Sequence, residues 1–93
     1  MKDQERPTRL LRQRVAARAA ADGPPIEAPY DDLACQIGEA AWRVTDAQVA
    51  SVLAAAGSEK AAFELIAAAA TGAGLLRWQQ AIKALEATSD APA

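Results

Sequence analysis

The sequence predicts an all-α fold of about four helices, and two observations support this. Twenty-six of the 93 residues are alanine and only four are aromatic, a composition that favours closely packed helices over strands. Apolar residues also recur at three- and four-residue steps between glycines, prolines and capping residues, which is the period of an amphipathic helix. Because alanine buries little area, the core is thin, and chains this short often gain stability by self-association.

A basic helix is expected over residues 7–21. Pro7 suits the first helical position, and good helix formers follow it, although the apolar stripe is narrow. Residues 1–21 carry six basic and two acidic side chains, whereas residues 22–93 carry four basic and ten acidic ones. The segment therefore either docks on the acidic remainder of the chain or forms an arm that binds an acidic partner. Five arginines would carry that contact: Arg6, Arg9, Arg12, Arg14 and Arg18.

Residues 22–29 predict a linker, because Gly23, Pro24 and Pro25 end the basic helix. A helical domain over residues 30–88 is expected to follow. Its first helix should cover residues 29–44, with two aspartates in the first turn, where carboxylates meet the positive end of the helix dipole.

A third helix is expected to begin at a capping box in residues 45–48 and to end at Gly57. In the box, the Thr45 hydroxyl and the Gln48 side chain each bond the other residue's backbone amide. Ser58 then caps a fourth helix.

The fourth helix contains Gly72 and Gly74, each of which costs about 1 kcal/mol relative to alanine in a helix interior. Because no proline or polar turn accompanies them, we expect a continuous helix to about residue 88, in which the glycines pack against a neighbouring backbone. A disordered tail over residues 89–93 should follow. Two apolar stripes are predicted on this helix, the first formed by Phe63, Ile66, Ala70 and Ala73, and the second, at heptad-like spacing, by Leu75, Trp78, Ile82 and Leu85.

Composition also predicts the compartment. No run approaches the ~18 uninterrupted apolar residues of a membrane span, and no apolar stretch follows the first basic residues as a secretory signal requires. The single cysteine, Cys35, excludes an internal disulfide and fits a reducing environment. We therefore expect a cytoplasmic protein without membrane contact, and the alanine and arginine bias is typical of a GC-rich bacterium.

Residues 42–57 read WRVTDAQVASVLAAAG, and residues 58–77 read SEKAAFELIAAAATGAGLLR. The region from about residue 33 to residue 85 resembles the helical family of carboxymuconolactone decarboxylase-like and alkylhydroperoxidase D-like proteins. The resemblance implies a helical unit that assembles into trimers, hexamers or similar oligomers. It also implies, for the peroxidase branch, a Cys-x-x-Cys pair with a histidine and a glutamate, and for the decarboxylase branch a histidine. Because this sequence has no histidine and one cysteine, only the scaffold carries over.

Six residues are candidates for an interface or a ligand cleft: Cys35, Glu39, Trp42, Arg43, Arg77 and Trp78. Cys35 lies one helical turn before Glu39, which would be the proton acceptor of a peroxidatic or redox-sensing thiol. A nearby carboxylate disfavours the thiolate, so a small core residue is the favoured interpretation. The two Trp/Arg neighbours either supply bulk to the core or form interface hot spots.

No catalytic residue, metal site or cofactor is expected. Adjacent carboxylates such as Asp31 and Asp32 diverge by ~100° on a helix, so they cannot share one ion. Without histidine, a zinc site would need carboxylates alone. The string at residues 71–74 lacks the lysine and the preceding strand of a phosphate loop.

These observations favour a non-catalytic helical oligomerisation or protein-interaction module that forms a homo-oligomer. A small-ligand carrier or thiol-redox protein that uses a cleft between subunits is the alternative. Nucleic-acid contact through the arginine-rich segment is a third option, which the pI near 5.0 and the lack of aromatic residues in the segment disfavour.

Overall fold

A computed structural model describes residues 7–89, and within that range all regular secondary structure is helical, which confirms the all-α prediction. In chain order the elements are α1 (Arg9–Ala19), α2 (Tyr30–Ala40), the 3-10 turn η2 (Ala41–Arg43), α3 (Asp46–Ala56) and α4 (Glu59–Ser89).

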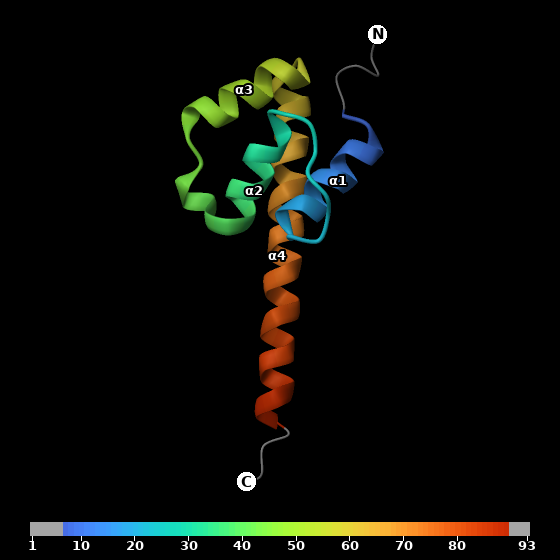
Figure 1. Ribbon diagram of the computed structural model, residues 1–93, viewed down its shortest axis with the longest axis vertical. Helices are drawn as coiled ribbons and strands as arrows, with labels where there is room; N and C mark the ends of the chain where they lie inside the picture. Colours follow the sequence, from blue (N-terminus) through green and yellow to red (C-terminus); the bar gives the residue numbers. More distant parts are fainter. Residues whose placement is uncertain (1–6, 90–93) are drawn as a thin grey trace.

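The longest element is α4, a single helix of 31 residues that is roughly 46 Å long at 1.5 Å per residue. The three shorter helices gather around its first half, and its second half projects from this body (Figure 1). The molecule accordingly measures 61 Å along its longest axis and 26 and 21 Å along the others. The predicted continuous helix is confirmed. Of the predicted disordered tail, Ser89 ends α4 and residues 90–93 lie outside the described range.

Helix α1 begins two residues later than Pro7. Thr8 is its N-cap, and the Thr8 hydroxyl accepts a hydrogen bond from the Leu11 N–H at 3.1 Å. The threonine cap, and not the proline, therefore determines where the helix begins. Val15 and Ala19 of α1 are buried against the other helices. The basic segment is therefore docked on the rest of the chain, which was one of its two predicted alternatives.

Helix α2 carries both aspartates in its first turn, as predicted, but it ends at Ala40 and not at residue 44. Two side chains donate hydrogen bonds to backbone carbonyls in its last turn: Gln36 to the Ala40 oxygen at 3.3 Å, and Arg77 to the Gly38 oxygen at 2.6 Å. The chain then continues as the 3-10 turn that carries Trp42.

The capping box of α3 is confirmed in both directions. The Gln48 N–H donates to the Thr45 hydroxyl at 3.1 Å, and the Thr45 N–H donates to the Gln48 side-chain oxygen at 3.0 Å. Gly57 ends the helix in the left-handed region at φ 89°, and the Ala61 N–H donates to the Ser58 hydroxyl at 3.1 Å at the start of α4. Each of these local signals was readable from the sequence.

The core lies where all four helices meet along the first half of α4. It contains mostly small and branched side chains: Val15, Ala19, Ile26, Leu33, Ala34, Ile37, Val52, Ala62, Leu65, Ala69 and Ala73. The first predicted stripe of α4 is wrong in part: Ala73 is buried and Ile66 packs against the core, but Phe63 is 70% exposed. Leu65 and Ala69, which the stripe left out, are buried instead. Alanine occupies several sides of this helix, so periodicity alone does not identify the buried one.

Two glycines allow α1 to approach its neighbours closely. A Cβ atom on Gly38 of α2 would collide with the carbonyl oxygen of Ala19, and a Cβ atom on Gly72 of α4 would collide with that of Ala16. The predicted packing reason is therefore found for Gly72. Nothing lies within 4 Å of the corresponding position at Gly74.

Candidate functional site

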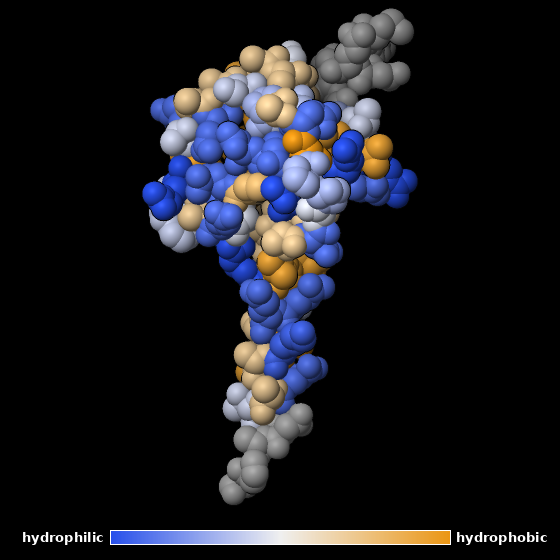
Figure 2. Space-filling view, viewed as in Figure 1, coloured by the Kyte–Doolittle hydropathy of each residue, from blue (hydrophilic) through white to orange (hydrophobic). Residues whose placement is uncertain are grey.

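A row of exposed, large apolar side chains lies on the second half of α4. The four residues of the second predicted stripe, Leu75, Trp78, Ile82 and Leu85, are called the C-terminal stripe below. Leu75 is 55% exposed, Trp78 65% and Leu85 63%, while Ile82 is half-buried. On the face in Figure 2, hydrophobic surface gathers where α4 leaves the body, and polar residues alternate with it further along.

The C-terminal stripe is not a continuation of the core face of α4. At 100° per residue, its centre lies about 160° around the helix from the centre of the buried residues Ala62, Leu65, Ala69 and Ala73. On the projecting segment, Gln80 and Lys83 follow the direction of the core face. The helix thus has two apolar faces, one used by the body and one directed elsewhere.

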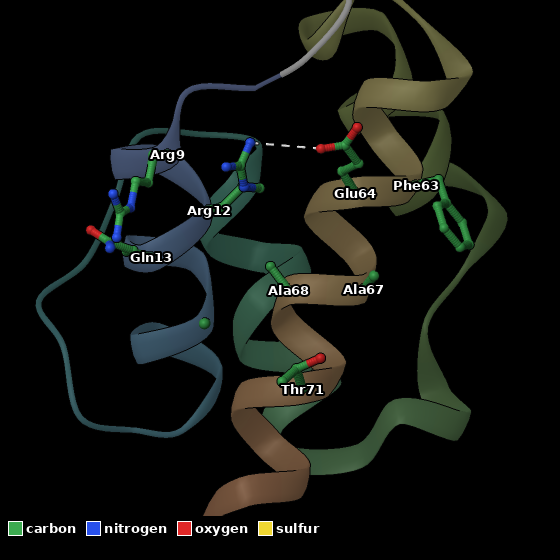
Figure 3. Close-up of a pocket in the computed structure, with 9 residues that line it drawn as sticks. Arg9, Arg12, Gln13, Phe63, Glu64, Ala67, Ala68 and Thr71 are labelled. Carbon is green, nitrogen blue, oxygen red and sulfur yellow. Dashed lines mark ion pairs between the residues drawn. The ribbon is translucent and has the colours of Figure 1, made fainter.

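On the body, the side of α4 that carries the C-terminal stripe borders a groove against α1. The groove has a volume of about 470 Å³, and Ala67, Ala68 and Thr71 of α4 contribute to its lining (Figure 3). Arg12 of α1 and Glu64 of α4 form an ion pair across it, with 3.6 Å between Nη1 and Oε1. The stripe and the groove therefore form successive parts of one side of α4.

A second cluster joins the end of α1 to the start of α2. Arg18 Nε donates to Asp31 Oδ1 at 2.8 Å, and the same carboxylate oxygen accepts from the Ile26 N–H at 3.1 Å. These hydrogen bonds, first the one from Ile26 and then the one from Arg18, lower the pKa of Asp31 below its ordinary value. The cluster fixes the segment between the helices, where Ile26 enters the core.

Cys35 lies beside this cluster, with its sulfur 4.0 Å from Asp31 Oδ2. Burial raises the pKa of the Cys35 thiol, the Asp31 charge raises it further, and Arg18 opposes the change without reversing it. A reactive cysteine needs the opposite shift. These surroundings disfavour a redox thiol, but Cys35 is partly exposed and is not one of the core residues, so its interpretation as a small core residue is not confirmed.

The six interface or cleft candidates do not form one site, because they lie on three elements: two on α2, two on η2 and two on the second half of α4. Arg77 reaches the end of α2, where it bonds the Gly38 carbonyl next to Glu39. Trp42 is 83% exposed on η2, so neither tryptophan supplies bulk to the core. Two grooves lie beside α1, of about 470 and 500 Å³, and none of the six candidates lines either of them.

The predicted arginine arm divides into two groups. Arg12 and Arg18 form ion pairs within the chain, whereas Arg9 and Arg14 are exposed. Arg6 lies outside the described residues. Docking of the basic helix on the rest of the chain accounts for the two paired arginines. The opposite net charges of residues 1–21 and 22–93 indicated this docking in the sequence.

Within the described part of the chain, no three His, Cys, Asp or Glu side chains are close enough to bind one metal ion. None of the helices in that part combines the length and the apolar character that crossing a bilayer requires.

Comparison with known proteins gives no match: no model of a protein family, no curated protein and no solved structure corresponds significantly to this chain. The resemblance to carboxymuconolactone decarboxylase-like proteins therefore stays a prediction.

Proposed function

We propose that this chain is a non-catalytic helical self-association module, and that a second copy packs on the C-terminal stripe. One observation carries this: Trp78 is 65% exposed within a row of large apolar residues on a helix that projects from its own body. An aromatic side chain of this size contributes roughly 150–250 Å² when it is buried. The 3-4-3 spacing of the row is that of a helix-pairing seam.

The small size of the body supports the same function. Five of the eleven buried core residues are alanines, and of the aromatic side chains only the partly buried Tyr30 packs against them in the described part of the chain, so the core supplies little apolar area per residue. Beyond Arg77, α4 continues with every side chain of residues 78–88 exposed except the half-buried Ile82, so the body contributes little packing to this segment. A partner helix would stabilise this segment and cover its stripe.

Light scattering coupled to size exclusion at tens of micromolar tests the proposal. The wild-type chain is expected to have the mass of a dimer or a larger oligomer, and Trp78→Glu is expected to have the mass of one chain, because a charge in the seam must be desolvated. Trp42→Glu is the matched control, since Trp42 is exposed away from the stripe, and it should keep the oligomer. Circular dichroism establishes that each variant is folded. A monomeric wild-type chain would disprove self-association.

A further inference from the structure

The C-terminal stripe has the same spacing in both directions along α4. Its members are separated by three, four and three residues. A second copy can therefore align its stripe with this one in two ways, parallel or antiparallel, and both alignments bring all four positions into register. What distinguishes them is the volume of each layer and the residues that flank the seam.

Layer volumes favour the antiparallel pair. In a parallel pair, Trp78 of one copy meets Trp78 of the other, so one layer holds two indoles and its neighbours hold only aliphatic side chains. In an antiparallel pair, each Trp78 meets Ile82, and each Leu75 meets Leu85. A seam packs without voids or strain when large side chains face smaller ones, which only the antiparallel pair achieves here.

The side chains on the two sides of the C-terminal stripe, called its flanks, differ in size. One flank, at seven-residue spacing, consists of Gly74, Ala81 and Thr88, which are all exposed, and the other contains Gln79 and Glu86. Gly74 has no neighbour within 4 Å of the position of a Cβ atom, so its own chain gives it no packing reason. Small residues along one flank let a partner helix come close on that side.

Symmetry determines which flanks meet. In an antiparallel pair, the two-fold axis lies across the helices and brings each flank against the same flank of the partner, so the small residues of both copies meet. In a parallel pair, the axis runs along the helices, and each small flank faces Gln79 and Glu86. From the flanks and the layers together, and on the basis of the proposed self-association, we infer that two copies pair through antiparallel α4 helices, with Leu75 against Leu85 and Trp78 against Ile82.

The short length of the stripe also favours the antiparallel pair. Residues 75–88 form a seam only about 21 Å long, whereas stable interfaces bury roughly 1,200–2,000 Å² in total. In the antiparallel pair, the end of the partner's α4 runs past Gly74 to Thr71, at the border of the groove between α1 and α4. The contact thereby extends onto the body, and the two bodies lie at opposite ends of the pair.

Cysteine cross-linking tests the orientation. In a Cys35→Ala background, Leu75→Cys and Leu85→Cys are prepared separately, and each is oxidised alone and as an equimolar mixture. The antiparallel pair predicts at least fivefold more disulfide-linked dimer in the mixture than in either variant alone, because only position 75 of one copy and position 85 of the other are within bridging distance.

Light scattering on the same reduced samples separates the two levels of the inference. Efficient cross-linking of each variant with itself, or an oligomer that gives no preference for the mixed disulfide, overturns the antiparallel orientation and leaves self-association intact. A monomeric mass for the Cys35→Ala parent and the wild-type chain overturns both. Circular dichroism of each variant confirms that the helices are formed.

Discussion

The carbonyl oxygen of Ala16 occupies the position that a methyl group on Gly72 would need. This contact sets the distance between α1 and α4, the two helices whose close approach builds much of the core. It also explains why a glycine lies in the middle of a 31-residue helix.

Gly72→Ala is therefore expected to lower the free energy of unfolding by about 1–3 kcal/mol, because overpacking forces α1 outward. This loss is what remains after the better helix propensity of alanine, worth about 1 kcal/mol, is subtracted, because the collision is with a backbone oxygen that cannot rotate away. Gly74→Ala is the matched control and should be neutral or stabilising, since its surroundings are open. Urea unfolding of both variants in the Trp78→Glu background separates folding from association. Equal effects of the two substitutions would contradict the contact.

Between residues 7 and 89, two residues adopt left-handed backbone conformations at helix ends, Gly57 with φ 89° after α3 and Ala21 with φ 57° after α1. A side chain in this region costs roughly 1–2 kcal/mol. Gly57→Ala should therefore destabilise the fold by about that amount, and Ala21→Gly should stabilise it by up to about 1 kcal/mol. Ala20→Gly is the control for flexibility, because Ala20 has φ −83°, and it should not stabilise. Thermal unfolding midpoints of the three variants test these signs.

The sequence predicted the ends of the helices better than their packing. The capping box at Thr45 and the left-handed end at Gly57 depend on neighbouring residues only, so they follow from local chemistry. The buried face of α4 does not, because alanine lies on several sides of the helix and the position of α1 decides which side is covered. The end of α2 was also missed, since Arg77 reaches it from α4, 39 residues away in sequence from Gly38.

The candidate surface was predictable only in part. The heptad-like spacing of the C-terminal stripe is visible in the sequence, but its exposure follows from the way three short helices cover only the first half of α4 (Figure 1). The Arg18–Asp31 pair was missed because each residue had a sufficient local explanation, a basic helix face and a first-turn carboxylate. Only the turn between α1 and α2 brings them together.

The stability of the fold should depend on pH through Asp31. Its pKa in the folded chain lies below the ordinary value of 3.8, so the ionised carboxylate favours the folded state. The contribution is complete above about pH 4 and is lost as the pH falls through the lowered pKa. Asp31→Asn should therefore unfold at a lower temperature than the wild type at pH 6 and approach it near pH 2. A difference in melting temperature that stays constant between pH 6 and pH 2 would disprove this role.

Cys35 should be a slow thiol. Its pKa is raised from the ordinary value of 9.0 by burial and by Asp31, so little thiolate is present at pH 8. Alkylation by iodoacetamide at pH 8 is expected to be at least tenfold slower in the folded chain than in urea. Asp31→Asn removes one of the three causes that raise this pKa, the third being the charge of Glu39, and should increase the folded rate. A rate equal to that of a free thiol would restore the redox alternative.

Trp78 reports directly on the proposed association, because the chain contains only two tryptophans and both are exposed in the single copy. In Trp42→Phe, the remaining indole of Trp78 should emit at shorter wavelength at high protein concentration, where a second copy covers it, and shift to the red on dilution. In Trp78→Phe, the indole of Trp42 lies outside the stripe, so its emission should not change with concentration. Fluorescence spectra from about 0.1 to 100 μM distinguish these cases. The midpoint of the shift gives the dissociation constant, which converts to a free energy of association.

A red emission of Trp78 that is constant over the whole range would place the stripe in water at every concentration, and the C-terminal stripe would then not be the surface of self-association.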